Sequence, residues 1–488
     1  MTITDVEQEL VASVPTGLFI AGTWREASDG ARIEVEDPST GLVFASVADA
    51  TVADGDAALA AASAAQDEWA HTAPRERAEL LRRAFELLTS RAQDFATLMT
   101  LEVGKPLAES RAEVGYGAEF LRWFSEEAVR ISGSWTTAPD GQGRLLTMKK
   151  PVGPTLMVTP WNFPLAMGTR KVGPALAAGC SMVVKPASQT PLTMLAFADL
   201  LREAGLPAGV LNVITTTRTR EGMEPLVRDP RTRKLTFTGS TPVGRRLVEQ
   251  SASQLLRVSM ELGGNAPFIV FEDADLDAAV EGAMLAKMRN MGEACTAANR
   301  FLVHESVVGT FVEALTARMA QLVVGRGSDD GVTVGPLIDS TALAKVAQLV
   351  DDAVVRGARV VCGGKVVGDS GYFYAPTVVT DVPPEAALHG EEIFGPVAPV
   401  TTFRTEEEAL AAANATEYGL AAYVYTRDVS RVIRVCEALE VGMVGVNQGS
   451  VSNAAAPFGG VKASGFGREG GPDGIEEYLE TTYVGLAT

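Results

Sequence analysis

The chain has 488 residues, of which 46% are hydrophobic, and acidic residues outnumber basic ones by 61 to 42, giving a net charge of −19. This length predicts two or three domains. The acidity argues against nucleic-acid binding, because phosphate contacts need clustered Lys and Arg. No apolar run approaches the roughly 18 residues of a membrane span. The polar start "MTITDVEQEL" does not resemble a secretion signal, so we expect a cytoplasmic protein that does not bind membranes.

The N-terminal third predicts helices followed by a hairpin. Residues 56–91 form one alanine-rich helical stretch with Pro74 as a helix start, and a second helical pattern covers 109–130. Residues 131–153 are rich in Gly, Ser and Thr with alternating apolar positions, which predicts a hairpin that leaves the body. The C-terminal "YLETTYVGLAT" predicts a strand too short to be stable alone. We expect it to pair with another strand, such as the hairpin of a neighbouring subunit.

Between these segments, short apolar runs alternate with helix-length amphipathic segments. The runs are "PTLMVTP", "SMVVKPA", "GVLNVIT", "KLTFTGS" and "RVSMELGG", and the pattern resumes later with "RFLVHES", "ARVVCGG" and "APVTTF". Alternating strands and helices predict βαβ units and a parallel, doubly wound sheet. The fold class is therefore α/β with two such domains and a protruding hairpin.

Two glycine-rich stretches are candidate phosphate sites. "GFGREG" (465–470) matches the dinucleotide fingerprint literally, but too little chain follows for the required βαβ unit, so we interpret it as a surface loop. "KLTFTGSTPVGRRL" runs from a strand through Gly239 and Ser240 to Pro242, a residue suited to the first helical position. Such a turn presents N–H groups to a phosphate, although it is also a common strand–helix connection.

The cysteines do not predict a metal site or a disulfide scaffold. Cys180, Cys295, Cys362 and Cys436 lie far apart, no CxxC pair occurs, and the chain has only three histidines. Cys295 lies among small and polar residues in "MGEACTAANR". The residues around it leave two readings open, a small core residue or a nucleophile.

Five segments taken in order resolve this question by resemblance. "VTPWNFPLAMGTRKVGPALAAGC", "VSMELGGNAPFIVF", "MGEACTAANR", "EEIFGPVAPV" and "PFGGVKASGFGRE" together resemble the aldehyde dehydrogenase superfamily, over nearly the whole chain. The resemblance implies a cofactor-binding domain in 1–131 and 152–261 and a catalytic domain in 262–466. It also implies an oligomerisation segment in 132–151 and 467–488, so we expect a homodimer or homotetramer.

The resemblance implies three catalytic residues. Cys295 attacks the aldehyde carbon as a thiolate, and Asn162 with the Cys295 N–H binds the resulting oxyanion. After hydride transfer to a nicotinamide, Glu261 deprotonates the water that hydrolyses the thioester. A buried ion pair is the alternative role for Glu261.

The resemblance also implies a cofactor site. The residues expected there are Pro160, Trp161, Lys185, Ser188, Gly239, Ser240, Gly244, Gly263, Glu392 and Phe394. Lys185 would bind the adenosine ribose, and Glu392 the nicotinamide ribose. Many NAD-preferring relatives carry an acid at the position of Ser188, and serine removes its repulsion of a 2′-phosphate. We therefore expect NADP, with NAD as a weaker cofactor, although Ser188 could also simply cap a turn.

Two arginines and a serine bear on the substrate. Arg170, Arg289 and Ser452 match the carboxylate-binding positions of the succinate-semialdehyde dehydrogenase subfamily, and arginine presents a planar, bidentate donor pair. A single arginine could equally form a structural salt bridge. The expected substrate is a small carboxylated aldehyde, succinate semialdehyde, with glutarate semialdehyde or another short ω-carboxy aldehyde as the alternative.

Two departures from the family pattern stand out. Glu293 replaces a common Gln and adds a negative charge near Cys295, and Ala297 occupies the position where some relatives carry a second, regulatory cysteine.

A non-catalytic structural relative is the remaining alternative, and the intact Cys295, Glu261 and Asn162 argue against it. Acylating chemistry with coenzyme A is disfavoured by Glu261.

Overall fold

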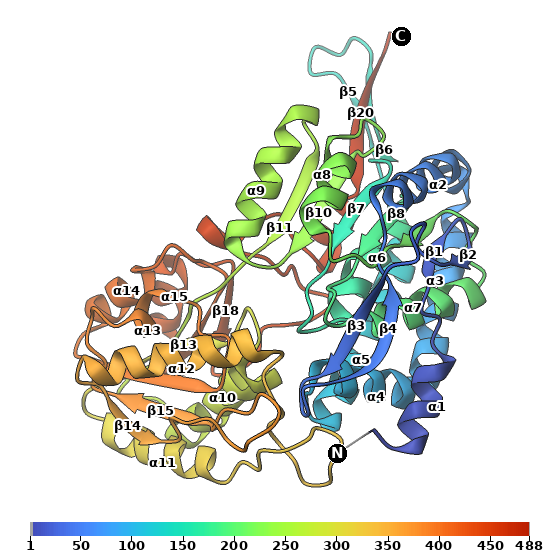
Figure 1. Ribbon diagram of the computed structural model, residues 1–488. Helices are drawn as coiled ribbons and strands as arrows, with labels where there is room; N and C mark the ends of the chain where they lie inside the picture. Colours follow the sequence, from blue (N-terminus) through green and yellow to red (C-terminus); the bar gives the residue numbers. More distant parts are fainter. Residues whose placement is uncertain (1–2, 488) are drawn as a thin grey trace.

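The computed structural model describes residues 3–487. Two α/β bodies lie side by side, and an arm of three strands projects from the first of them (Figure 1). Within the described residues, no helix is both long enough and apolar enough to cross a membrane. The fold is α/β, as the alternating sequence pattern predicts.

The first body is built on an eight-stranded sheet in the order β19-β11-β10-β7-β8-β9-β1-β2. Its five central strands are parallel, and antiparallel strands extend both edges. Their apolar runs are almost wholly buried, as expected when helices cover both faces of a parallel sheet. The strands are β1 (Leu18–Ile20), β2 (Thr23–Arg25), β7 (Thr155–Val158), β8 (Met182–Lys185), β9 (Leu211–Val213), β10 (Lys234–Thr238), β11 (Arg257–Glu261) and β19 (Gly465–Phe466).

The helices of this body confirm the prediction that a helix starts at Pro74. The alanine-rich stretch 56–91 lies in two helices, because Pro74 begins the second and disfavours a helical conformation at the residue before it. The helices are α1 (Asp5–Ser13), α2 (Val52–His71), α3 (Pro74–Ser90), α4 (Ala92–Val103), α5 (Leu107–Glu127), α6 (Ala166–Ala178), α7 (Leu192–Glu203), α8 (Thr219–Arg228) and α9 (Thr241–Ser251). A separate two-stranded sheet is formed by β3 (Arg32–Asp37) and β4 (Leu42–Ala48).

The second body contains a seven-stranded sheet in the order β14-β15-β16-β13-β12-β17-β18. Its strands are β12 (Ala266–Val270), β13 (Ala298–His304), β14 (Arg359–Cys362), β15 (Thr377–Thr380), β16 (Val397–Phe403), β17 (Ala421–Tyr425) and β18 (Met443–Val446). Its helices are α10 (Leu276–Met288), α11 (Val308–Ala320), α12 (Ser340–Val355), α13 (Ala387–Gly390), α14 (Glu406–Asn414) and α15 (Val429–Ala438). We propose that the two bodies are the cofactor-binding and catalytic domains.

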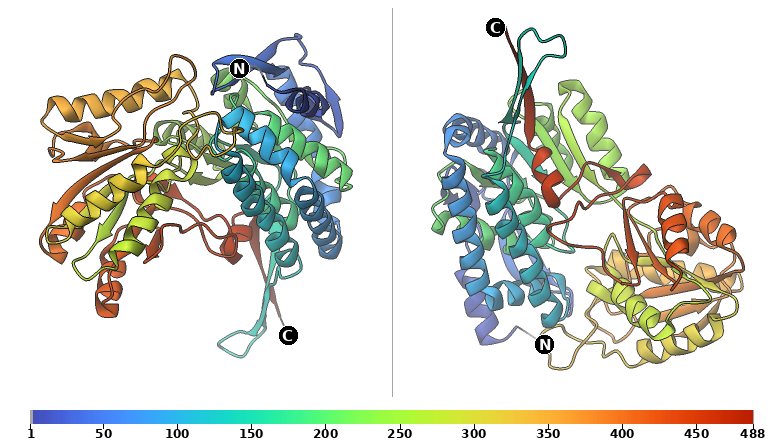
Figure 2. Two further views of the ribbon diagram at one scale, coloured as in Figure 1. Left: turned by 90° about the horizontal axis from the view of Figure 1, so that it is seen from below. Right: turned by 180° about the vertical axis from the view of Figure 1, so that it is seen from behind.

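The arm consists of the predicted hairpin and the C-terminal strand. β5 (Ser134–Thr137) pairs with β6 (Arg144–Pro151), and β20 (Leu479–Leu486) pairs with β6 over its whole length. Both views in Figure 2 show the arm projecting away from the two bodies. The expectation that β20 pairs with a neighbouring subunit's hairpin is therefore corrected, because the hairpin of the same chain supplies its partner.

The segment "GFGREG" is not a surface loop, as we interpreted it. Gly465 and Phe466 form β19, which pairs with β11 opposite Glu261 and Met260 and closes one edge of the first sheet. Gly465 has a φ of 105°, and a Cβ there would lie 1.9 Å from the Met260 carbonyl oxygen. The glycine therefore permits a close backbone approach rather than phosphate binding. A short helix, α16 (Gly471–Glu476), follows.

Gly282 in α10 provides a test of the packing in the second body. A Cβ at Gly282 would lie 1.5 Å from Tyr425 Oη, and the Tyr425 ring is stacked on Phe268. We expect G282A to lower the free energy of unfolding by about 1–3 kcal/mol through overpacking. The control is Gly115 in α5, where a Cβ meets open space and G115A should stabilise the protein by roughly 0.5–1 kcal/mol. Urea unfolding of both variants measures this, and equal effects would contradict the packing shown here.

Candidate active site

The carboxyl ends of the strands of the first sheet face a cavity of about 460 Å³ that brings together most of the predicted site residues. Asn162 follows β7, Gly239 and Ser240 follow β10, and Glu261 ends β11. Cys295 reaches the same cavity from the second body, just before β13. The other lining residues are Pro160, Trp161, Met167, Thr238, Leu262, Gly263, Ile338, Asp339, Thr341, Ala342, Lys345, Glu392 and Phe394. Ligands bind at this edge in open α/β sheets.

A strained turn carries Cys295. Asn290 and Met291 both have left-handed backbone angles, with φ values of 52° and 55°. Such angles are costly for residues other than glycine and persist only where surrounding contacts hold them. Here the Asn290 side-chain amide donates hydrogen bonds to the carbonyls of Asn162 (3.1 Å) and Glu293 (3.0 Å). The turn thus fixes the nucleophile's loop to the loop that carries Asn162.

The Asn162 side chain is held in place by one hydrogen bond. Its Nδ2 donates one hydrogen bond to the Glu293 carbonyl at 2.9 Å. A primary amide has two N–H donors, so the second remains for a ligand. The Lys105 ammonium holds the backbone carbonyl of Asn162 at 2.9 Å and forms a buried ion pair with Glu113. Glu113 in turn accepts the N–H groups of Leu165 and Ala166 at the start of α6.

Burial dominates the acid–base properties of the cavity. Burial raises the pKa of the Cys295 thiol to about 12, against the opposing effects of Arg170 and Arg289. Burial, together with repulsion from Glu469, raises the pKa of Glu261 well above its usual value. Both carboxylate oxygens of Glu261 are buried and lack a hydrogen-bond partner among the described residues. A carboxyl group that has no hydrogen-bond partner and lies beside a thiol is suited to the role of a general base rather than to that of a structural ion pair.

The predicted grip on the substrate by two arginines differs from the structure in one respect. Arg170 is not free, because its guanidinium forms an ion pair with Glu469, and neighbouring Lys171 binds the same carboxylate. All three side chains are at most 4% exposed. The Arg170 guanidinium also lies 4.1 Å from the centre of the Phe458 ring. The Nη2 group of Arg170 is buried and has no hydrogen-bond partner among the described residues.

Sequence reasoning missed Glu469, Lys171, Lys105 and Glu113. One signal could have revealed the first two, because the adjacent bases Arg170 and Lys171 interrupt an otherwise apolar helix and buried bases require an acid. Nothing local in the sequence marks the position of Glu469 as that acid.

Glu293, which the sequence analysis noted as a departure from the family pattern, is buried. Its Oε1 accepts the Ile338 N–H at 3.1 Å, and burial raises its pKa well above the usual value.

Four of the residues expected at the nicotinamide end of the cofactor site, Trp161, Gly263, Glu392 and Phe394, line the cavity. Burial raises the pKa of Glu392 to about 7, and its Oε1 accepts the Gly264 N–H at 2.9 Å. A Cβ at Gly263 would lie 3.0 Å from Glu392 Oε2, so glycine keeps this wall open. The rings of Trp161 and Phe394 meet edge to face at 5.4 Å.

The remaining cofactor residues lie outside the cavity lining. Lys185 ends β8 as a buried cation with no ion pair among the described residues, and burial lowers its pKa to about 8. An unpaired buried cation fits a ligand rich in hydroxyl and phosphate oxygens. Ser188 is half-buried and bonds to Gln189. Gly244 does not face the cavity, because its missing side chain allows α9 to pack on Leu262, whose Cδ2 would lie 2.3 Å from a Cβ.

Arg289 and Ser452 meet beside the cavity. Arg289 Nη1 donates to Ser452 Oγ at 3.4 Å, and its guanidinium stacks 4.8 Å from the centre of the Phe163 ring. No carboxylate lies within ion-pair distance of Arg289 in the described part of the chain. Arg289 is therefore the available cation next to the nucleophile.

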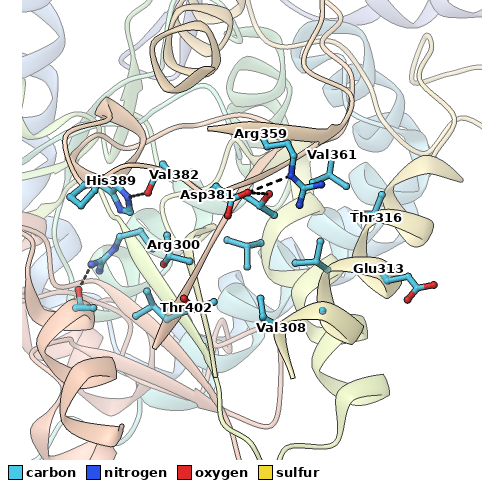
Figure 3. Close-up of a pocket in the computed structure, with 18 of the residues that line it drawn as sticks. Arg300, Val308, Glu313, Thr316, Arg359, Val361, Asp381, Val382, His389 and Thr402 are labelled. Carbon is cyan, nitrogen blue, oxygen red and sulfur yellow. Dashed lines mark hydrogen bonds and ion pairs between the residues drawn. The ribbon is translucent and has the colours of Figure 1, made fainter. Parts of the chain in front are cut away.

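A second, larger cavity of about 1050 Å³ lies between α11, β14, β15 and β16 and holds none of the predicted site residues. Figure 3 shows its polar groups engaged with one another: Arg359 with Asp381, and His389 with the Val382 carbonyl. No cluster of three or more potential metal ligands occurs within residues 3–487.

The raised pKa of the Cys295 thiol predicts how its reactivity depends on pH. Only the thiolate alkylates, and its fraction grows about tenfold per pH unit below the pKa. Incorporation of an iodoacetamide label into the ligand-free protein should therefore accelerate by about that factor per unit between pH 6 and pH 9. The Cys295→Ala variant controls for the other thiols. A rate already at its plateau at pH 7 would show that the resting thiol is ionised.

Comparison with known proteins agrees with this geometry. The chain matches the model of the aldehyde dehydrogenase family over residues 24–484. It is 62% identical to a succinate-semialdehyde dehydrogenase of Paenarthrobacter nicotinovorans, over 91% of this chain and 99% of the relative. It is 52% identical, over 96% of both chains, to the NADP(+) succinate-semialdehyde dehydrogenase GabD of Escherichia coli and, equally, to a glutarate-semialdehyde dehydrogenase of Pseudomonas putida.

A crystal structure described as an E. coli NADP-dependent enzyme superposes with a TM-score of 0.97 at 50% identity and covers all of both chains. Since the family model spans most of the sequence and these relatives match nearly end to end, the chain belongs to the aldehyde dehydrogenase family.

Proposed function

We propose that this aldehyde dehydrogenase oxidises succinate semialdehyde to succinate with NADP. The observation that supports this substrate concerns Arg289. This cation forms no ion pair among the described residues and donates to Ser452 beside the Cys295 cavity. A carboxylate at the far end of a short aldehyde supplies the charge that Arg289 lacks. The 62% identical relative is a succinate-semialdehyde dehydrogenase, which supports the same class.

The proposed chemistry begins at Cys295. The thiolate adds to the aldehyde carbon, and the free N–H of Asn162 together with the Cys295 N–H stabilises the oxyanion of the thiohemiacetal. NADP+ held in this cavity would supply the hydride acceptor. Glu261 then takes a proton from the water that hydrolyses the thioester and releases succinate. Its raised pKa makes the ionised carboxylate a stronger base for this step.

NADP fits the residues present. Lys185 is a buried, unpaired cation after β8, and Glu392 and the open wall at Gly263 form the nicotinamide end. Ser188 places no negative charge near a 2′-phosphate. The E. coli relative GabD is named for NADP(+), while NAD remains a weaker cofactor in this proposal.

Glutarate semialdehyde is the second candidate substrate, because a relative with that name is 52% identical. One methylene changes binding by only about 1–3 kcal/mol in a pocket.

We also propose a homo-oligomer joined through the arm, since Trp135 and Tyr483 there are 61% and 62% exposed. A cytoplasmic location is part of the proposal and is consistent with the four free cysteines.

The substrate proposal is tested with butyraldehyde, which has the carbon count of succinate semialdehyde but no distal carboxylate. With NADP as oxidant, kcat/KM for butyraldehyde should be lower by roughly 10⁴-fold, because the polar site would be left unpaired. Near-equal values would indicate a general aliphatic aldehyde dehydrogenase. Glutarate semialdehyde in the same assay separates the two carboxylated candidates.

The cofactor proposal is tested by Ser188→Glu. A carboxylate there should repel the 2′-phosphate and raise the KM for NADP at least about tenfold, leaving the KM for NAD much less affected. The matched control is Ser188→Ala, which adds no charge and should change the NADP/NAD ratio far less. Equal effects of S188E on both cofactors would contradict the assigned role.

A further inference from the structure

Tyr116 lies at the junction of two cavities. It lines a third space, of about 460 Å³, together with Ser452 and Asn453, between α5 and the segment that precedes "PFGG". On its other side it packs against the apolar cluster that contains Met167 and Ala294. Met167 lines the catalytic cavity and Ala294 precedes Cys295. The Tyr116 side chain therefore lies within reach of both the nucleophile's loop and Ser452.

The hydroxyl group of Tyr116 is buried and has no hydrogen-bond partner among the described residues. Its ring is fixed, since it meets Phe120 edge to face at 5.0 Å and the Arg289 guanidinium lies 5.6 Å from its centre. A buried hydroxyl without a partner is costly, and phenylalanine would avoid that cost at this position. The unpaired hydroxyl thus points to a ligand as its missing partner.

The charges around Tyr116 favour an anionic ligand. Within residues 3–487 Arg289 forms no ion pair, whereas the two acids that line the space beside Tyr116 already have basic partners. Glu119 pairs with Arg122 at 2.9 Å, and Glu126 lies 3.9 Å from Arg130. Both acids are also largely exposed, so water screens them.

Three side chains with donor groups therefore lie in one small region: Arg289 bonds to Ser452, its guanidinium lies against the Tyr116 ring, and Tyr116 and Ser452 line the same space. Arg170 contributes less, because Glu469 already neutralises it. A planar carboxylate has two oxygens and about four acceptor sites, which suits three donors. We propose that the Tyr116 hydroxyl donates a hydrogen bond to the distal carboxylate of the aldehyde and so helps to select carboxylated over uncharged aldehydes, an inference that rests on the proposed function.

Tyr116→Phe tests the inference by removing one oxygen atom. The ratio of kcat/KM for succinate semialdehyde to that for butyraldehyde should fall at least about tenfold, because a hydrogen bond to a charged group is lost. The change should lie in the KM for the carboxylated aldehyde. The inhibition constant of succinate against butyraldehyde oxidation should rise by a similar factor.

The matched control is Tyr425→Phe. The Tyr425 hydroxyl is also buried and unpartnered but packs inside the second body, so Y425F should leave the selectivity ratio unchanged. If Y116F lowers the thermal stability too far, Tyr116→Met removes the donor with a flexible apolar side chain, and the same fall in the ratio is expected.

The outcomes separate the two proposals. A wild-type enzyme without preference for the carboxylated aldehyde would overturn both the proposed substrate and the role of Tyr116. A wild-type enzyme with strong preference, together with a Y116F variant whose ratio and succinate inhibition match the wild type, would overturn the role of Tyr116 alone. A fall in the ratio that Y425F reproduces would likewise overturn it, because the effect would not be specific to this hydroxyl.

Discussion

The active site depends on the ion pairs that the buried carboxylate of Glu469 forms with two bases of α6. The carboxylate neutralises Arg170 and Lys171, two adjacent bases in α6 that are almost completely withdrawn from solvent. Buried charges are tolerated only when they are paired, and removal of one partner leaves an uncompensated charge. Glu469 follows β19, so this pairing also fixes the segment after the second body onto the first sheet. The ion cluster therefore holds the chain that returns from the second body against α6 of the first.

The same cluster sets the chemistry of the groups beside it. Arg170 favours ionisation of Cys295, whereas burial, Glu392 and Glu261 oppose it. Glu469 carries the negative charge that pairs with the two bases, and its repulsion adds to burial in raising the pKa of Glu261. Two carboxyl groups in one low-dielectric environment thus take different roles, one permanently ionised and one able to exchange a proton. Such divergence is how a protein assigns acid–base roles to chemically identical side chains.

A second layer of contacts holds the reacting groups in position. Lys105 and Asn290 both bind the Asn162 carbonyl, and Glu293 accepts the Asn162 amide through its own backbone. The left-handed angles of Asn290 and Met291 are maintained by these contacts. Asn162 and Cys295 come from different bodies, so their relative position is fixed by hydrogen bonds across the interface rather than by either sheet alone.

The sequence by itself determined the α/β class, the hairpin and ten of the residues that line the catalytic cavity, because strand–helix alternation and ordered motifs are local properties of the chain. It did not determine which segments pair with the edge strands or which acid neutralises the buried bases. The structure alone shows that β20 pairs within its own chain, that "GFGREG" contributes a strand and a buried acid, and that Arg170 is neutralised. These features are contacts between residues separated by hundreds of positions, as in the pair Lys171–Glu469. Local pattern carries no information about such partners, since only the packed fold decides which buried charge meets which.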